Sequence, residues 1–268
     1  MSSESPSEFK HKYNSTHNIK NVKRSGAGLR VAVSCKQCGD IESVTASRVR
    51  AGKKKFCSSS CSQLYIENES VDLSNSNATS YIGGVYVGDG SIGRYNGENV
   101  FRLNTIDKKF RDEAEAALSE LGFNTYSSSY HPESDNESEI FFVRIRSMRI
   151  VKYLENNFSK CDPEVIKSGL HSKVDKSYFI KGFYESEGSA CEDRYDIRMS
   201  QKNKGPLVAV SDLLDDLGFD SNIYAYTNTN EEPIHILQII GGRDERLRFF
   251  EEFNPVIRNE KDEIITRI

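Results

Sequence analysis

The sequence predicts an α+β protein in which one domain is duplicated and follows a small cysteine-rich module. Two observations carry this prediction. The same order of patterns (helix, strands, helix, strand, helix) occurs twice with a period near 98 residues. Four of the six cysteines lie within residues 31–66. A period this long exceeds that of solenoid repeats, so it indicates a duplicated domain with pseudo-two-fold symmetry.

The chain divides by composition. Residues 1–30 are polar and poor in large apolar side chains, which predicts a flexible, basic arm. Ser and Asn dominate the stretch before the first repeat, as is typical of a linker. The predicted segments are the arm (1–30), the cysteine module (31–68), a linker (69–79), the first repeat (80–158), an inter-repeat linker (159–176) and the second repeat (177–268).

Charge and hydropathy exclude some classes of protein. No apolar run approaches the roughly 18 to 20 residues of a membrane span, so we expect no membrane insertion. The polar N-terminus lacks an apolar signal region, which predicts an intracellular, reducing compartment with few disulfides. The net charge is −4, but residues 1–70 hold 12 basic against 6 acidic residues and the remainder 24 against 34. The overall acidity therefore hides a basic segment that suits a polyanion.

Strand patterns recur in both repeats. Asn96-Gly97 between short β-prone runs predicts a type I′ hairpin. Alternation in the strand 101–105 turns Phe101 and Leu103 toward a core. Several strands thereby present polar and basic side chains on one face of an antiparallel sheet. The outward residues expected to line this groove floor include Arg102, Asn104, Arg144, Arg198 and Ser200.

Each repeat opens with a helix pattern that carries small residues. Gly84 and Gly88 in the first repeat correspond to Gly182 and Ser186 in the second. Residues four apart lie on the same face of a helix. Small side chains there allow two helix backbones to approach closely, so we expect the two opening helices to pack against each other.

An acid follows the small residues in both repeats. Asp89 and Glu187 are each followed by a glycine, Gly90 and Gly188, which suits a left-handed position at the end of a helix. A carboxylate at this negative end of the helix dipole costs roughly 0.3 to 1 kcal/mol, and two converging acids also repel each other. A divalent cation held by these oxygens relieves both effects. Paired acids, a cation and a basic face indicate phosphodiester hydrolysis.

The segments IGGVYVGDG (82–90) and IKGFYESEG (180–188) resemble the two signature motifs of the LAGLIDADG homing endonucleases. The resemblance covers residues 80 to 258 and implies a duplicated αββαββα fold in a monomer that is an internal pseudo-dimer. It implies cleavage of both strands of a long double-stranded DNA target with Mg²⁺, or with Mn²⁺ or Ca²⁺ in the same site. No splicing motifs flank the repeats, which favours a free-standing or intron-encoded enzyme over an intein.

The resemblance also assigns residues. The metal-binding acids are Asp89 and Glu187, with the main-chain carbonyls of Gly88 and Ser186 as further ligands. The other motif acid, which does not bind metal, corresponds to Val87 and Glu185, and Lys181 replaces a residue that is usually small. Around the attacking water, the resemblance places the polar residue Gln201 of the second repeat, whose counterpart in the first repeat is Thr105 or Ile106. The basic residues that it places there are Arg146 or Arg149 of the first repeat and Arg243 of the second.

Other interpretations of the paired motifs exist. A glycine-rich nucleotide-binding loop would need a preceding strand and a following lysine, which this segment lacks. The acids could instead be solvated helix ends in a non-cleaving relative, such as an RNA-splicing maturase that binds intron RNA or a transcription regulator. Retention of both acids favours cleavage.

The four cysteines form two closely spaced pairs, Cys35-x2-Cys38 and Cys57-x3-Cys61, which is the pattern of a zinc site. So short a module cannot build a sufficient core by itself, so we expect a structural Zn²⁺ rather than unmetallated thiols. The basic residues between the two cysteine pairs suit DNA phosphates, although a solvated loop also explains them. They are Arg48, Arg50, Lys53, Lys54 and Lys55.

Overall fold

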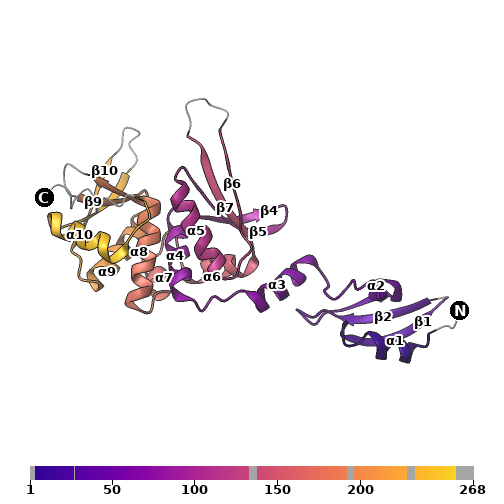
Figure 1. Cartoon of the computed structure of the whole chain (residues 1–268). Helices are drawn as coiled ribbons and strands as arrows, with labels where there is room; N and C mark the ends of the chain where they lie inside the picture. The colour runs from indigo at the N-terminus through magenta and orange to yellow at the C-terminus, as the bar shows by residue number, and fades with distance from the viewer. Residues whose placement is uncertain (1–3, 27, 133–137, 192–195, 228–232, 258–268) are drawn as a thin grey trace. The chain divides into compact units, whose positions relative to one another are not determined.

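The computed structural model describes residues 4–26, 28–132, 138–191, 196–227 and 233–257 (Figure 1). The chain forms two compact units, residues 1–70 and residues 71–268. The predicted second repeat extends to residue 268, and its last part, residues 258–268, lies outside the described residues.

The described residues of the N-terminal unit form a three-stranded antiparallel sheet in the order β1-β2-β3 and three helices. A small apolar core includes Phe9, Val31, Val33 and Val44. The elements are α1 (Pro6–Tyr13), β1 (Ile19–Ser25), β2 (Gly28–Ser34), β3 (Ile41–Thr45), α2 (Ala46–Arg50) and α3 (Ser59–Ser70).

Residues 4–26 and 28–30 differ from the flexible arm that the composition of the first thirty residues predicts. Ser5 caps α1 in a reciprocal capping box with Glu8. Phe9 is fully buried and Ile19 is 3 % exposed, so both belong to the core of this unit. A few apolar side chains in a polar stretch are enough when they share a core with side chains of later strands, here Val31, Val33 and Val44. Average composition does not reveal such a core.

The predicted linker is also shorter than expected. Helix α3 continues to Ser70 and the next helix begins at Ser76, so a short connection joins the two helices. Val71 within this connection is buried in the core of the larger unit.

The larger unit contains the duplication (Figure 1). Its two sheets are antiparallel and have corresponding orders, β4-β5-β7-β6 and β8-β9-β11-β10. The first half consists of α4 (Ser76–Val87), β4 (Ser91–Tyr95), β5 (Glu98–Thr105), α5 (Lys108–Glu120), β6 (Tyr126–Tyr130), β7 (Ile140–Arg146) and α6 (Met148–Asn157). After α7 (Pro163–Ser168), the second half consists of α8 (Lys173–Glu187), β8 (Gly188–Cys191), β9 (Asp196–Gln201), α9 (Lys204–Asp216), β10 (Ser221–Thr227), β11 (Pro233–Ile239) and α10 (Gly242–Phe253).

The repeated Leu-Gly-Phe sequence ends the middle helix of each half. Gly122 and Gly218 both adopt positive φ, a backbone conformation that glycine tolerates without strain. The backbone N–H groups of Phe123 and Phe219 then donate to carbonyls of the last helical turn. Both phenylalanine side chains are buried, so the turn fixes where each helix stops and returns the chain to the core.

The strand predictions are confirmed. Asn96 and Gly97 both have positive φ, as a type I′ turn requires, and connect β4 to β5. Phe101 and Leu103 are fully buried, whereas Asn104 on the same strand is exposed. One face of the sheet therefore packs on the helices and the other carries polar side chains.

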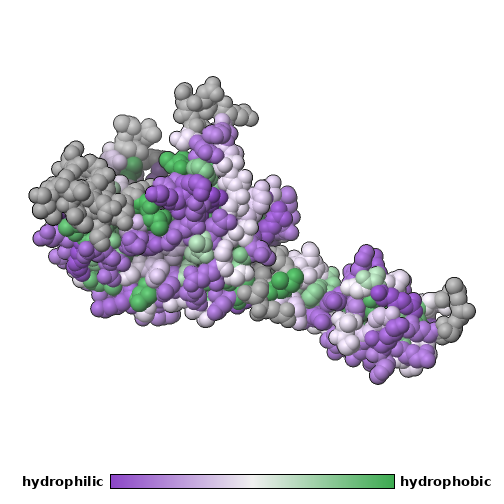
Figure 2. Space-filling view, viewed as in Figure 1, coloured by the Kyte–Doolittle hydropathy of each residue, from purple (hydrophilic) through white to green (hydrophobic). Residues whose placement is uncertain are grey.

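Helices α4 and α8 lie side by side between the two sheets of the larger unit (Figure 1). Hydrophilic residues cover much of the visible surface of both units (Figure 2). Among the described residues, no helix combines the length and the apolar character that crossing a membrane requires.

Candidate functional site at the ends of the paired motif helices

The small residues of α4 and α8 allow the helix backbones to touch. A β-carbon at Gly84 would lie 2.1 Å from the carbonyl oxygen of Phe179, and one at Gly182 would lie 2.3 Å from that of Tyr81. No real β-carbon tolerates such a distance, so glycine is required at both positions. The predicted packing of the two opening helices is therefore confirmed.

The same contact continues to the C-terminal ends of the helices. A β-carbon at Gly88 would lie 2.3 Å from the β-carbon of Ser186 and 3.4 Å from Cγ of Glu187. Asp89 follows Gly88 directly and is exposed, whereas Glu187 is half-buried. The fold thus brings the two acidic ends together, as the paired motifs predict.

The glycines after the acids serve a different purpose from the one expected. Neither Gly90 nor Gly188 has a positive φ. A β-carbon at Gly90 would lie 2.8 Å from Cα of Tyr86, and one at Gly188 would lie 2.2 Å from the ring of Tyr184. The chain turns back against its own helix to begin β4 and β8, so close approach, rather than left-handed backbone, requires glycine.

Gln201 at the end of β9 belongs to this site. Its Nε2 donates a 2.6 Å hydrogen bond to Oε1 of Glu187. The two expected counterparts in the first half have other environments: Thr105 Oγ1 accepts from the N–H of Asp107, and Ile106 is 70 % exposed.

Lys160 lies at this candidate site, and sequence reasoning did not single it out. Its Nζ donates to the carbonyl oxygens of Gly88 (2.9 Å) and Gly90 (2.7 Å). Partial burial lowers the pKa of Lys160, while the charges of Glu187 and Asp89 act in the opposite direction. Lys160 lies in the predicted inter-repeat linker, where it matches no motif. The one feature of the sequence that could have indicated Lys160 is that this lysine follows closely after the last helix of the first repeat.

Glu185 is buried within the helix pair. Its carboxylate accepts hydrogen bonds from the Tyr81 hydroxyl (2.6 Å) and the Val256 N–H (2.7 Å). Burial raises the pKa of Glu185 to about 7, although these bonds and Lys181 lower it. Lys181 pairs with Glu113 and lies over the Tyr81 ring, so this larger residue is accommodated at the edge of the pair.

Of the arginines predicted to act on the phosphate, two have a contact partner in the structure and the third is half-buried. Arg146 forms a 3.0 Å ion pair with Glu98. Arg149 donates to the carbonyl oxygen of Val71, which precedes the N-terminal end of α4 and so lies away from Asp89. Arg243 is half-buried in the first turn of α10. Their catalytic role stays a prediction.

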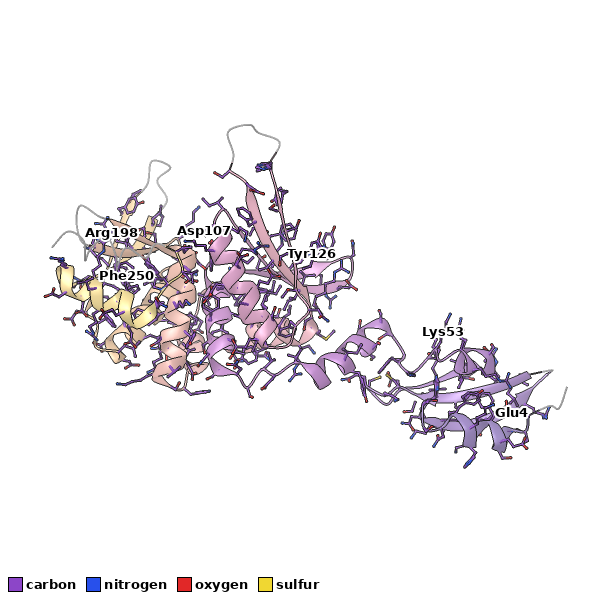
Figure 3. The ribbon with its side chains drawn as sticks, viewed as in Figure 1. Glu4, Lys53, Asp107, Tyr126, Arg198 and Phe250 are labelled. Carbon is purple, nitrogen blue, oxygen red and sulfur yellow. The ribbon has the colours of Figure 1, made fainter. Side chains whose placement is uncertain are left out.

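The outer face of the first sheet combines arginines with aromatic rings. The guanidinium carbon of Arg144 lies 4.4 Å from the ring centre of Tyr126, and that of Arg102 lies 5.0 Å from Phe142. Arg102 Nε also donates to Asn104 Oδ1 (2.6 Å). Tyr126, labelled in Figure 3, is 53 % exposed. These contacts place both guanidinium groups against aromatic rings of the same sheet face.

On the corresponding face of the second sheet, the positive charge of Arg198 has an acidic partner. Arg198, also labelled in Figure 3, forms an ion pair with the buried Asp196. Ser200 is half-buried on the same strand, and Tyr224 and Tyr226 on β10 are 39 % and 48 % exposed.

Comparison with known proteins decides the family. Residues 76–157 and 175–254 match the LAGLIDADG-like domain, one match for each half of the larger unit. The chain belongs to the LAGLIDADG family. Two uncharacterized proteins of Methanocaldococcus jannaschii are relatives: MJ0314 is 28 % identical over 63 % of this chain, and MJ0398 is 30 % identical over 50 %. The matches span 65 % and 49 % of those two proteins.

Solved structures show the same LAGLIDADG fold. Variants of the homing endonuclease I-DmoI align over 67 % of this chain and 96 % of their own, with a TM-score of 0.51 and 20 % identity. I-DmoI in complex with DNA and Mn aligns with a TM-score of 0.50, 20 % identity and coverage of 66 % and 96 %. Full-length WhiA from Thermatoga maritima aligns with a TM-score of 0.51, 13 % identity and coverage of 72 % and 60 %.

The four cysteines lie outside the matched LAGLIDADG segments and form a compact cluster. All four sulfurs lie within 4.8 Å of one another, with Cys57 Sγ 3.5 Å from Cys38 Sγ and 3.4 Å from Cys61 Sγ. Sulfurs around a tetrahedral zinc ion are separated by about 3.8 Å, so this donor set fits Zn²⁺. Burial raises the pKa of Cys35, but hydrogen bonds from nearby backbone N–H groups outweigh it and lower that pKa to about 6.

The basic residues between the cysteine pairs are partly neutralised. Arg50 pairs with Glu4, which is labelled in Figure 3, and Lys54 pairs with Glu42. The carbonyl oxygen of Lys53, also labelled, lies 3.0 Å from Nε2 of the buried His17, so its backbone is held within the unit. Phosphate contacts by these residues stay a prediction.

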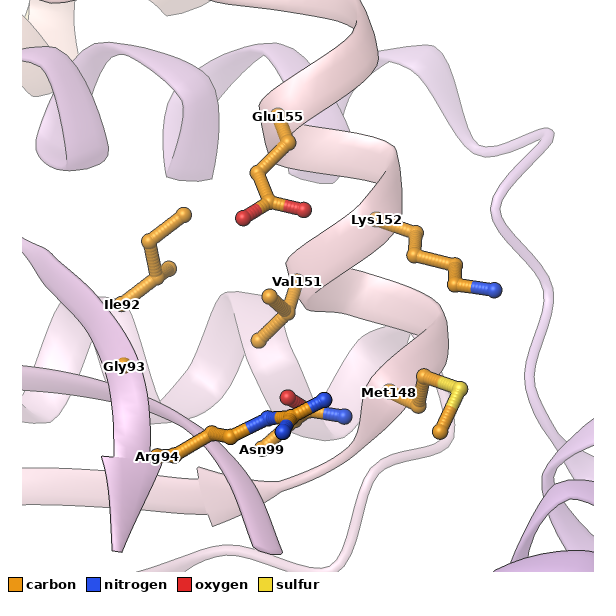
Figure 4. A pocket seen from close by; sticks show the side chains of 8 residues that line it. All are labelled: Ile92, Gly93, Arg94, Asn99, Met148, Val151, Lys152 and Glu155. Atoms are coloured by element: carbon orange, nitrogen blue, oxygen red, sulfur yellow. The ribbon is translucent and has the colours of Figure 1, made fainter.

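A separate pocket lies between the β4–β5 hairpin and α6 (Figure 4). Arg94, Asn99, Lys152 and Glu155 provide its polar lining. It contains none of the residues predicted for the site.

Proposed function

We propose that the larger unit is a site-specific DNA endonuclease that hydrolyses both strands of a double-stranded target with a divalent cation. The contact between Gly88 and Ser186 carries this proposal, because it brings the adjacent acids Asp89 and Glu187 to one place. In a protein that only binds DNA, nothing requires two carboxylates to converge at the negative ends of two helices.

The donors at this place fit a hard cation. Asp89 and Glu187 offer carboxylate oxygens, and Ser186 offers a main-chain carbonyl. The carbonyl of Gly88 accepts from Lys160 Nζ and would offer its second lone pair. Mg²⁺ prefers such oxygen ligands, with Mn²⁺ and Ca²⁺ able to occupy similar sites. When bound, the cation supplies charge stabilisation at the phosphate and lowers the pKa of the attacking water.

The protein's own residues orient this chemistry. The hydrogen bond from Gln201 Nε2 fixes the direction of the Glu187 carboxylate. The close packing of α4 and α8 sets the position of one acid relative to the other, because each acid lies at the end of a packed helix. Arg146, which now pairs with Glu98, and Arg243 would supply positive charge toward the phosphate when DNA is bound.

DNA would lie along the polar faces of the two sheets. Arg102, Asn104 and Arg144 on the first sheet, and Arg198 and Ser200 on the second, would contact base edges in the major groove. Because both halves belong to one chain, a monomer suffices for a two-stranded target. The zinc-stabilised N-terminal unit, with its excess of basic residues, would extend the contact through phosphates.

The test uses purified full-length protein and the DNA that flanks its gene, joined as the uninterrupted allele. We expect a double-strand break in Mg²⁺ and none in EDTA. A randomised duplex library serves as a second substrate, so that an unsuitable target does not decide the result. DNA that is retained in a gel shift but remains intact in Mg²⁺, Mn²⁺ and Ca²⁺ would favour the alternative, a non-cleaving binder that regulates transcription or assists splicing of intron RNA.

A further inference from the structure

The sheet of the N-terminal unit has its core on one face. Val31 and Val33 of β2 share this core with Phe9 of α1 and Val49 of α2. The guanidinium carbon of Arg50, at the end of α2, lies 5.2 Å from the ring centre of Phe9. Both helices therefore cover the same face of the sheet.

The opposite face of the sheet, which we call the outer face, follows from the strand register. Successive residues of a strand point to opposite faces, and residues paired across strands point to the same face. The residues on the side away from Val31 are Asn21, Lys23 and Ser25 of β1, Arg30 and Ala32 of β2, and Ile41, Ser43 and Thr45 of β3. All of them except Ala32 are exposed. The described residues of this unit thus leave the outer face accessible.

Two like charges lie opposite each other on the outer face. Lys23 and Arg30 are direct cross-strand partners, and neither forms an ion pair with a described residue. None of the outer-face residues given above is acidic, and Glu42 of β3 lies opposite Val33 and so on the core side. Like charges directly opposite each other destabilise a sheet. The fold therefore keeps this pair at a cost that no described acid offsets.

The ion pairs of this unit involve other residues. Arg50 pairs with Glu4, and Lys54 pairs with Glu42. Lys23 and Arg30 keep their full charge, which suits a polyanion. The phosphates of a nucleic acid fit this requirement, because side chains that neutralise them release the condensed counterions.

The other side chains of the outer face favour a duplex over a single strand. Proteins that bind single strands stack the bases on aromatic rings, and no outer-face residue is aromatic. Asn21, Ser43 and Thr45 are short and polar, so the strands can approach a groove, as in other proteins that bind DNA through a sheet. Ile41 is 65 % exposed and offers an apolar contact for a sugar or a thymine methyl group.

We propose that the outer face of the N-terminal sheet is a second DNA-binding surface, on which Lys23 and Arg30 contact phosphates of a duplex. This inference rests on the part of the proposed function that makes double-stranded DNA the partner, and it does not depend on hydrolysis. It places the phosphate contacts of this unit on the sheet, in addition to any made by the basic residues between the two cysteine pairs.

The test measures the affinity of the full chain for a long duplex of random sequence over a range of salt concentrations. No chelator is added, so that the cysteine cluster is not disturbed. The paired change Lys23→Gln with Arg30→Gln should reduce the slope of log affinity against log salt by about 1.8, because each lost phosphate contact removes about 0.9. Exchanging the two residues, Lys23→Arg with Arg30→Lys, should retain the slope.

The matched control removes the same charge from the other side of the unit. Lys10 and Lys12 are exposed on α1, which packs on the core face. Lys10→Gln with Lys12→Gln should leave the slope nearly unchanged. Equal reductions in the two glutamine pairs would show that only the total charge of the unit matters and would overturn the proposal.

A second readout needs no DNA. At low salt, Lys23→Gln with Arg30→Gln should raise the melting temperature of the N-terminal unit by about 1 to 5 °C, because it removes the cross-strand repulsion. Weaker DNA binding together with higher stability is the result expected of a binding surface, whereas a misfolded variant would lose both. A lower melting temperature would contradict the claim that the pair is kept at a cost.

The outcomes separate this inference from the endonuclease. An unaltered protein that cuts its target, with the same salt slope as the Lys23→Gln, Arg30→Gln variant, would overturn the outer face as a DNA surface and leave the endonuclease intact. An unaltered protein that cuts no DNA, but loses salt slope through this variant, would overturn the endonuclease alone. Tighter binding of a single-stranded probe than of the duplex through the same two residues would also overturn the proposal.

Discussion

A β-carbon placed on Gly84 would lie 2.1 Å from the carbonyl oxygen of Phe179, so the backbones of the two motif helices are in direct contact. This contact sets the separation of the helix ends and hence of the two acids. The small residues of the two signature motifs therefore serve the packing of the helix pair.

Substitution at this contact should destabilise the larger unit. Gly84→Ala would gain up to about 1 kcal/mol in helix propensity but must push apart two backbones. Overpacking typically costs about 1–3 kcal/mol, and contact with backbone rather than a flexible side chain puts this variant near the upper end. Urea unfolding should detect the loss.

The control for this substitution is Gly93→Ala. A β-carbon at Gly93 would meet nothing within 4 Å. Because such a surface change disturbs no packing, it should alter the free energy of unfolding by less than about 0.5 kcal/mol. Equal losses in the two alanine variants would show that backbone contact does not limit Gly84.

The stability of the larger unit should depend on pH through Glu185. Burial raises the pKa of this carboxyl to about 7 from an ordinary value of 4.5. The folded state therefore binds the proton more tightly, so the stabilisation is complete below pH 4.5 and is lost as the pH rises through 7. The free energy of unfolding should fall by roughly 3 kcal/mol across this window from Glu185 alone.

Melting curves of Glu185→Gln and of the unaltered protein between pH 4.5 and 8 would check this dependence. The glutamine variant should lose this part of the slope. Glu251→Gln, at an exposed position on α10, should retain it. Parallel slopes for all three proteins would show that Glu185 titrates normally.

Zinc should control the folding of the N-terminal unit. The core of this unit is small. Structural zinc contributes on the order of 10 kcal/mol to the folding of comparable modules. A strong chelator, or Cys57→Ser, should abolish the melting transition of residues 1–70 and leave that of residues 71–268 unchanged. Cys161→Ser, at an exposed cysteine outside the cluster, is the control. One zinc per chain by elemental analysis would accompany this result.

The first sheet should contribute specific DNA contacts. Arg144→Gln should weaken specific binding by about 1–3 kcal/mol and relax base preference at one position. The control is Arg248→Gln on α10, whose guanidinium is bonded to the carbonyls of Leu217 and Gly218. Binding to selected duplexes at fixed salt would distinguish the two variants. Equal losses would mean that Arg144 acts only as general positive charge.

Much of the larger unit was predictable from sequence because its signals are local. The small-residue spacing, the Leu-Gly-Phe helix ends and Asn96-Gly97 each specify a backbone geometry within a few residues. The acids Asp89 and Glu187 could be found because they recur in the same place in both repeats.

The rest depends on contacts that composition and motifs do not record. Phe9 and Ile19 lie in no periodic pattern, yet they share one core with Val31, Val33 and Val44 of the later strands. Lys160 is 70 residues or more along the chain from the carbonyls that it contacts. Aligning the two repeats gives it no counterpart, so the comparison of repeats does not single it out. The sequence suggests the wrong reason for Gly90 and Gly188, because close approach cannot be read from the residue type alone.

The central claim is that Asp89 and Glu187 together form the hydrolytic centre. The most direct test is cleavage of a selected target by Asp89→Asn and Glu187→Gln, with Glu185→Gln as a matched control at a motif acid that faces the interior. We predict that each of the first two variants loses at least about a thousandfold in cleavage rate and still binds DNA nearly as tightly as the unaltered protein, while the control still cuts. Cleavage at the unaltered rate by either Asp89→Asn or Glu187→Gln would contradict the claim.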